Sequence, residues 1–345
     1  MFRRQNMLRR EIAAWLVCLT FAGVAGAASL LEQKIDEARR TARAIQGGVV
    51  GVEVVQLATG KVLYASNEDH LFTPDSNTKL FSTALALTRL GPKHRMTTRV
   101  MAVAAPDTKG RLEGDLTIVG GGDPSMSFIG IPYAAGAKPV DPLTGVEALA
   151  DQVTAAGVRS IAGGVVGDDT AYPADFYPPG WAADDAIWDY GAPVSALTLA
   201  DNSMRMDIGP GAGDDDPVTV TFTPAIGYFV VSNRVRVTAE GPHHLEVRRS
   251  GRQLELSGTI GRAGVTEWLA VDDPALFFAA AFHDALTRRG VSIGRGPSAA
   301  HRYEGAAAPA TGVALAERRS PELTELLKVT DKVSQNLWAE IMLRE

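Results

Sequence analysis

Two short motifs hold the residues of this 345-residue chain whose types and spacing suit catalysis. The first is Ser76-Asn77-Thr78-Lys79, just after Pro74 at the start of an apolar periodic run. Residues three apart share a helix face, so the Lys79 amine can reach the Ser76 hydroxyl. A charged lysine is disfavoured in a first helical turn, but a neutral one can take the proton of a serine nucleophile. The alternative is an ordinary helix start, with Ser76 or Asp75 as the cap and a solvated lysine.

The second motif is Ser334-Gln335-Asn336. The last helix of the chain is predicted to begin close to it. The Ser334 hydroxyl is suited to relay a proton, and the Asn336 amide is suited to hold a substrate carbonyl. A simple helix cap is the alternative interpretation. The two motifs in this order are a far more specific signal of serine catalysis than either motif alone. Ser-x-x-Lys and Ser-Asp-Asn, together with Lys-Thr-Gly, are the motifs of penicillin-binding proteins and class A β-lactamases.

The elements predicted around the first motif are a helix, a hairpin and a second helix. Apolar residues recur at helical spacing over 30–45, before Gly47-Gly48. Two strand-like runs flank Ala58-Thr59-Gly60, which predicts a β-hairpin. The run 79–90 predicts a helix that ends at Gly91-Pro92.

Further along, the sequence changes to short β-rich runs between about 93 and 265, with one helix predicted from about Val146 to Ala156. We interpret this block as one or two β-rich modules. The run 274–290 predicts a helix with Pro at its start and Gly at its end. Ser320 and Pro321 then predict the N-cap and first position of another helix.

The first 27 residues have the pattern of a secretory signal peptide. Four arginines precede an apolar run from Ile12 to Val24, and Ala25-Gly26-Ala27 offers a cleavage site. An anchoring transmembrane helix is the alternative, but the run is short for a span. Cys18, the only cysteine, lies in this segment, so the predicted mature chain has no disulfide or thiolate chemistry. These features predict a periplasmic protein with no membrane anchor after cleavage.

Composition excludes several other classes of function. Cleavage would remove four Arg and one Glu, taking the net charge from −6 to −9, which argues against nucleic acid as a partner. The six histidines show no metal-binding spacing, and there is no P-loop. The chemistry expected of Ser76 and Lys79 needs neither metal nor cofactor.

The chain resembles the class C low-molecular-weight penicillin-binding proteins, which are D-alanyl-D-alanine carboxypeptidase/endopeptidases of the penicillin-binding protein 4 type (peptidase family S13). The resemblance covers most of the predicted mature chain and is carried by LFTPDSNTKLFSTALAL, GDLTIVGGGDPS, VVGDDTAYPADFYPPGW, APVSALTLADN and SPELTELLKVTDKVSQNLWAEIMLRE. Gln335 replaces the commoner Asp of the second motif.

The resemblance implies an α/β (α+β) fold, a penicillin-binding-protein/β-lactamase-like serine transferase domain with inserted β-rich domains. Ser76 would be the nucleophile, Lys79 its base, Ser334 the proton relay and Asn336 the substrate-orienting amide. An acid in the insertion can contact the amino-bearing side chain of the peptide in this family, and Asp169 lies in the matching stretch. The substrates would be peptidoglycan stem peptides, and β-lactams would acylate the same serine.

One family motif is absent, because no Lys-Thr-Gly occurs in these 345 residues. The chain is therefore expected to be truncated before that motif, with an incomplete domain that β-lactams label weakly or not at all. The expected division is a signal peptide (1–27), a first catalytic part (28–92), an inserted β-rich part (93–265) and a return to the catalytic part (266–345).

The function expected from these features is a serine D-Ala-D-Ala carboxypeptidase, with endopeptidase activity left open. One alternative is a serine β-lactamase or esterase-like hydrolase that uses the same Ser/Lys pair; the long β-rich insertion argues against it. The other is an inactive, truncated wall-binding protein.

Overall fold

The structure is a computed structural model that describes residues 29–43, 47–211, 218–238, 244–307 and 311–345. It forms two compact units, Met1–Pro74 and Asp75–Glu345, which are considered separately. The predicted signal peptide lies outside the described residues. Within the described ranges, no helix is long and apolar enough to cross a membrane.

The first unit is a helix packed on a hairpin. Helix α2 (Leu30–Thr41) starts at a capping box formed by Ser29 and Glu32, and β1 (Val52–Gln56) pairs antiparallel with β2 (Lys61–Ser66). Tyr64 joins them, because its hydroxyl donates to Asp36 at 2.6 Å and accepts from Arg39 at 2.9 Å. The predicted helix and hairpin are both confirmed.

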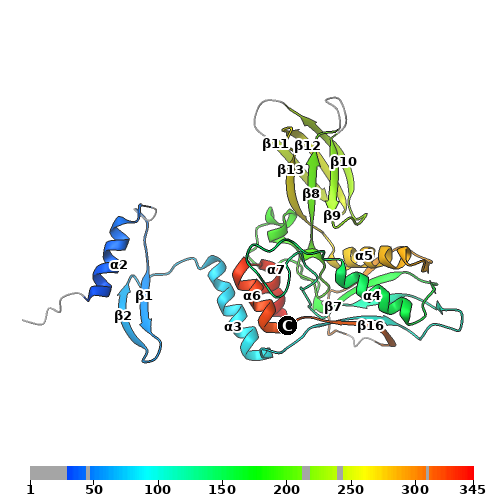
Figure 1. Ribbon diagram of the computed structural model, residues 1–345, viewed down its shortest axis with the longest axis horizontal. Coiled ribbons are helices and arrows are strands. Elements are labelled where there is room, and N and C mark those ends of the chain that lie inside the picture. The colour runs from blue at the N-terminus through cyan, green and yellow to red at the C-terminus, as the bar shows by residue number, and fades with distance from the viewer. Residues whose placement is uncertain (1–28, 44–46, 212–217, 239–243, 308–310) are drawn as a thin grey trace, which may run out of the picture. The chain divides into compact units, whose positions relative to one another are not determined.

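A five-stranded sheet forms the centre of the second unit, in the order β15-β7-β5-β3-β16. Helices α4 and α5 pack against it and against each other (Figure 1). The largest apolar core lies between these layers and includes Leu116, Ile118, Leu149, Phe278 and Phe282, all fully buried. The strands and helices of this layer are β3 (Thr97–Ala102), β5 (Leu116–Val119), α4 (Thr144–Ala155), β7 (Val165–Pro173), α5 (Pro274–Arg288), β15 (Ser298–Arg302) and β16 (Val313–Arg319).

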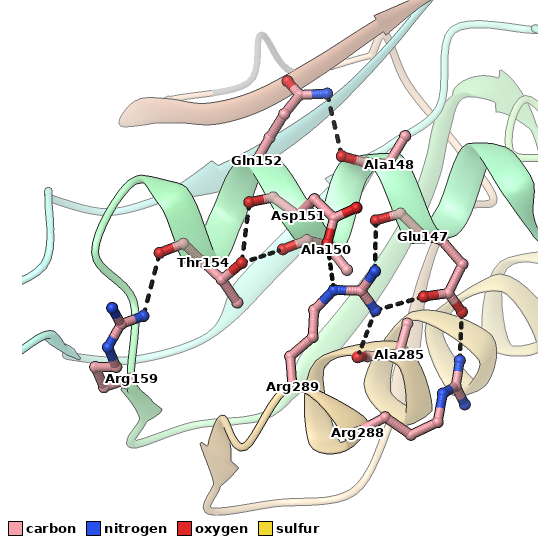
Figure 2. Close-up of polar contacts among 10 residues, drawn as sticks. All are labelled: Glu147, Ala148, Ala150, Asp151, Gln152, Thr154, Arg159, Ala285, Arg288 and Arg289. Carbon is pink, nitrogen blue, oxygen red and sulfur yellow. Dashed lines mark hydrogen bonds and ion pairs between the residues drawn. The ribbon is translucent and has the colours of Figure 1, made fainter.

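Ion pairs fasten α4 to the C-terminal end of α5 (Figure 2). The Arg289 guanidinium contacts Asp151 at 2.7 Å, the Glu147 carboxylate and, at 3.1 Å, the Glu147 carbonyl oxygen. Arg288 binds the other oxygen of Glu147. At its other end, α5 starts with Pro274 at its first position, as the sequence predicts, and the structure shows Asp273 as its N-cap.

Three smaller sheets accompany the five-stranded sheet in the second unit. Strands β13, β8 and β9 form one sheet, β10, β12 and β11 a second, and β14, β6 and β4 a third. The bounds of these strands are β4 (Arg111–Leu112), β6 (Ser160–Ile161), β8 (Ser203–Gly209), β9 (Thr219–Thr223), β10 (Val230–Val237), β11 (His244–Ser250), β12 (Gln253–Ile260), β13 (Val265–Ala270) and β14 (Ser292–Ile293). Three short 3₁₀ turns precede β8: η3 (Asp185–Ile187), η4 (Asp189–Gly191) and η5 (Ala200–Asn202).

Three helices form a separate layer that carries both sequence motifs. They are α3 (Lys79–Leu90), preceded by the 3₁₀ turn η2 (Asp75–Thr78), α6 (Leu323–Val333) and α7 (Asn336–Arg344). They lie side by side (Figure 1) and share an apolar core around Met96, Leu326, Trp338 and Ile341.

Two features of this unit differ from the sequence-based expectations. Ser320 does not cap α6, which begins at Leu323 after Glu322; instead its hydroxyl accepts from the Met96 N–H at 3.0 Å. The sheet also crosses the expected boundary at 265/266, because β15 and β16 pair with β7 and β3. Local composition shows where strands form but not which strands pair. The expected division into domains stays a prediction.

Candidate active site

Ser76 and Lys79 lie together at the start of α3. Ser76 is in the 3₁₀ turn η2, where residues three apart eclipse each other. The Lys79 ammonium nitrogen, Nζ, donates to the Ser76 hydroxyl oxygen at 3.0 Å. The turn before the helix, rather than a side-chain cap, positions the pair, since Thr78 at the N-cap makes no capping hydrogen bond.

Asn336 joins the pair from the first turn of α7. Its Oδ1 accepts from Lys79 Nζ at 2.6 Å, and its Nδ2 donates to the Tyr190 carbonyl oxygen at 2.8 Å. A backbone carbonyl can only accept, so the Tyr190 contact fixes which end of the amide faces Lys79. The motifs, 257 residues apart in sequence, therefore meet at one lysine nitrogen.

Ser334 lies in the sharp connection between α6 and α7. Its backbone is left-handed, with φ 60° and ψ 41°, and its N–H donates to the Thr330 carbonyl at the end of α6. Neither Ser334 nor Asn336 caps α7, because Gln335 does so by accepting from the Leu337 N–H at 3.3 Å. A non-glycine residue in this conformation costs about 1–2 kcal/mol, and such strain clusters at functional sites.

Ser334 faces the same small cavity as the Ser76/Lys79 pair. The cavity holds about 190 Å³ and is lined by Ser76, Asn77, Lys79, Leu80, Asp331 and Ser334. The structure thus brings together all four residues that the sequence predicts to be catalytic: Ser76, Lys79, Ser334 and Asn336.

The environment of Lys79 makes its amine easier to deprotonate. Burial lowers the pKa of the Lys79 amine, and the Glu340 carboxylate on α7 acts in the opposite direction. Burial disfavours a charged group because the protein solvates charge less well than water. A neutral Lys79 can accept the Ser76 proton while still donating to Asn336.

A larger cavity adjoins the second motif. It holds about 480 Å³, and its walls include Ser334, Gln335 and Asn336 together with aromatic rings and carboxylates. Its other principal lining residues are Phe128, Tyr133, Lys138, Asp189, Tyr190, Asp201, Ser203 and Trp268. Asp189 is exposed to solvent, but the surrounding protein partly desolvates its carboxylate and raises its pKa. Apolar walls with a few polar groups are typical of ligand sites.

A buried carboxylate in the wall of this cavity holds α7 in place. Asp201 accepts from the indole N–H of Trp338 at 2.8 Å and from the Ser127 hydroxyl at 2.6 Å. Trp338 is fully buried, two residues beyond Asn336. Burial raises the pKa of Asp201 to about 6. No local sequence pattern predicts this contact, which spans 137 residues.

Asp169, the predicted substrate contact, lies elsewhere. It is 2% exposed in β7, lines neither cavity, and accepts from the Ser195 hydroxyl at 2.9 Å. Its other oxygen contacts His301 Nδ1 at 2.9 Å, and His301 Nε2 contacts Asp273 at 3.3 Å. These contacts make Asp169 part of a buried network that joins β7, β15 and α5. The contact of Asp169 with substrate stays a prediction.

The geometry therefore supports nucleophilic chemistry at Ser76. The hydroxyl has a basic partner at hydrogen-bond distance, and that partner is oriented by a fixed amide. Among the residues that the structure describes, no cluster of three or more His, Cys, Asp or Glu side chains is placed to hold a metal ion.

Comparison with known proteins identifies relatives across nearly the whole chain. The family model described as D-Ala-D-Ala carboxypeptidase 3 (S13) matches residues 31–345. A D-alanyl-D-alanine carboxypeptidase of Actinomadura sp. (strain R39) is 33% identical over 316 residues, 87% of this chain and 54% of that protein. Penicillin-sensitive carboxypeptidase A of Dictyostelium discoideum is 24% identical, over 82% of this chain and 54% of that protein. The chain spans about half the length of these curated relatives.

The fold has solved counterparts as well. The crystal structure of penicillin binding protein 4 from Haemophilus influenzae matches with a TM-score of 0.70 at 20% identity, covering 85% of this chain and 61% of that one. A complex of the same protein with a β-lactam matches with a TM-score of 0.63. This likeness confirms the predicted fold class, and the family match confirms the resemblance seen in the sequence. The chain belongs to the D-Ala-D-Ala carboxypeptidase 3 (S13) family of peptidases.

Proposed function

We propose that the protein is a serine-type D-Ala-D-Ala carboxypeptidase that binds penicillin and acts on peptidoglycan stem peptides. The observation that carries the proposal is the contact of Lys79 Nζ with both Ser76 Oγ (3.0 Å) and Asn336 Oδ1 (2.6 Å). Family membership and the relative at 33% identity support the same activity.

In the proposed reaction, neutral Lys79 takes the Ser76 proton as Oγ bonds to the carbonyl carbon of the penultimate D-Ala. The carbon–nitrogen bond to the last D-Ala then breaks, and the leaving nitrogen receives a proton by way of Ser334. Water then hydrolyses the ester on Ser76, which returns the serine. Each step is general acid–base or nucleophilic chemistry.

The side chain of Asn336 orients Lys79, and the adjoining cavity of about 480 Å³ offers space for the rest of the stem peptide. β-Lactams would acylate Ser76 in the same way, since their strained carbonyl presents the same electrophile. We also propose export to the periplasm through residues 1–27. N-terminal sequencing of the secreted protein would test cleavage after Ala27.

The direct test is release of D-Ala from an N-acylated Lys-D-Ala-D-Ala peptide by the protein as its gene encodes it. We expect turnover that Ser76→Ala abolishes, and equal turnover by both proteins would refute the proposal. A chromogenic cephalosporin separates the β-lactamase alternative. Rapid repeated hydrolysis would favour a β-lactamase, whereas a single slowly released equivalent is expected of a carboxypeptidase.

A further inference from the structure

The first turn of α7 is held by hydrogen bonds on two of its faces. Asn336 donates through Nδ2 to the Tyr190 carbonyl at 2.8 Å. Trp338 donates through its indole N–H to the Asp201 carboxylate, also at 2.8 Å. Side chains two residues apart point about 200° apart around a helix axis. The two bonds therefore restrict both the shift and the rotation of this turn, and with them the direction in which Asn336 Oδ1 meets Lys79.

Asp201 lies in a strained, buried turn and has no cationic partner. Ala200, Asp201 and Asn202 are all left-handed, with φ values of 51°, 55° and 52°. Residues other than glycine rarely adopt this conformation, and the surrounding structure must hold those that do. The carboxylate accepts from Trp338 and Ser127, which are neutral, and no ion pair within 4 Å joins it to a cation in the described part of the chain. Burying a charge without a counter-charge costs stability, so stability alone does not account for this turn.

The same carboxylate connects α7 to the wall of the larger cavity. Its second oxygen accepts from the Ser127 hydroxyl at 2.6 Å. The Ser127 oxygen accepts in turn from the Ile129 N–H at 3.0 Å, and both Phe128 and Ile129 line the cavity. One buried side chain is therefore bonded to the cavity wall on one side and to the helix that carries Asn336 on the other.

We propose that Asp201 is a positioning residue for the reaction, and that it acts through Trp338 on Asn336. Held in this way, Asn336 orients Lys79, which receives the Ser76 proton in the proposed function on which this inference rests. Reaction rates depend steeply on such alignment, because a misplacement of about 1 Å can slow catalysis roughly 10²-fold. Loss of the bond between Asp201 and Trp338 should therefore slow acylation at saturation more than it weakens ligand binding.

Rapid-quench kinetics with a fluorescent penicillin separate these two effects in the protein as its gene encodes it. They give a limiting rate of acylation and a concentration for half-saturation. Trp338→Phe keeps a ring in the core and removes the N–H donor. We expect it to lower the limiting rate by roughly 10–10²-fold and to leave the half-saturation concentration nearly unchanged.

Substitutions of the acceptor test the same bond from its other side. Asp201→Ala should lower the limiting rate as Trp338→Phe does, and Asp201→Asn should restore most of it, because the amide oxygen still accepts from the indole. The double variant Asp201→Ala/Trp338→Phe should be no slower than the slower single variant, since both changes remove one bond. Should Trp338→Phe fail to fold, the comparison of Asp201→Ala with Asp201→Asn decides.

Asp123→Asn is the matched control. Asp123 is another buried carboxylate near the cavity wall, but it bonds Ser125 and Arg318 rather than α7. Its substitution should make the protein unfold at lower urea concentration while leaving the limiting rate unchanged. A wild-type limiting rate in Trp338→Phe, or an equal loss in Asp123→Asn, would overturn the proposal.

A second measurement needs no acylation. In protein with ¹⁵N-labelled asparagine, Asn336→Leu assigns the side-chain amide of Asn336, whose bond to Tyr190 slows exchange of its hydrogen with solvent. Exchange should be faster in Trp338→Phe and unchanged in Asp123→Asn. Equal exchange in wild type and Trp338→Phe would overturn the inference even if Ser76 is acylated. Faster exchange in Trp338→Phe, with no acylation of the wild type, would support the inference while refuting the proposed function.

Discussion

Replacing Asp201 by asparagine is expected to abolish a pH-dependent change in stability. The backbone of Asp201 is left-handed (φ 55°), a conformation that asparagine also tolerates. The amide oxygen of asparagine can accept from Trp338, and its NH₂ group can donate to Ser127. The substitution therefore removes the ionisable group while keeping the shape and the partners that hold α7.

The magnitude follows from the pKa of Asp201, which burial raises from 3.8 to about 6. Between these values the folded protein binds the proton more tightly than the unfolded chain. The free energy of unfolding therefore falls as pH rises from 4 to 6, and then levels off. Since one pKa unit corresponds to about 1.36 kcal/mol, the full effect is about 3 kcal/mol, of which about 2 kcal/mol lies between pH 4 and 7.5.

Urea unfolding of both proteins, followed by tryptophan fluorescence at pH 4 and 7.5, measures the effect. The stability of Asp201→Asn relative to wild type should improve by about 2 kcal/mol on going from pH 4 to 7.5. Asp284→Asn, which alters a half-exposed carboxylate on α5, is the control and should show no such trend. A difference for Asp201→Asn that stays constant across this range would show that Asp201 does not titrate with a raised pKa.

Three further substitutions test the roles of His301, Ser334 and Asn336. His301→Asn should destabilise the protein at pH 7, because His301 joins Asp169 and Asp273 and these contacts raise its pKa to about 10. The contribution of the imidazolium is complete below pH 6.5 and is lost as pH rises through 10, so denaturation curves of the two proteins should converge at high pH. Ser334→Gly should relieve the left-handed backbone strain at this residue and add up to about 1 kcal/mol of stability. It should also slow acylation by a β-lactam. A loss of stability would contradict the expected relief of strain. Asn336→Leu should slow acylation by roughly 10²–10³-fold, because Lys79 loses its orienting acceptor, and an unchanged rate in stopped-flow fluorescence would count against that role.

Local sequence signals predict the parts of the site that depend on neighbours in sequence. The spacing of Ser76 and Lys79 sets their contact, and apolar residues at helical spacing after Asn336 set the buried face of α7. Asp273 and Pro274 likewise start α5 where the pattern predicts a helix. In each case a turn or helix brings the residues together, so spacing is sufficient.

Side-chain contacts between segments that are distant in sequence could not be predicted from local patterns. Ser320 has the residue type of a cap, but its hydroxyl bonds the Met96 backbone, which no local pattern reveals. The contact of Asp169 with His301 depends on the pairing of β15 with β7, which no local pattern reveals. The Tyr190 carbonyl and the Trp338–Asp201 bond also depend on tertiary packing, although a tryptophan two residues beyond Asn336 indicates a buried anchor.

Acylation by a penicillin is the direct test of Ser76 as the nucleophile. The protein as its gene encodes it would be incubated with a penicillin, and its mass and digest peptides would be measured. We expect a single adduct on the peptide that contains Ser76, absent in Ser76→Ala and formed more slowly in Lys79→Ala. No adduct in the wild-type protein, or the same adduct after Ser76→Ala, would show that Ser76 is not the nucleophile.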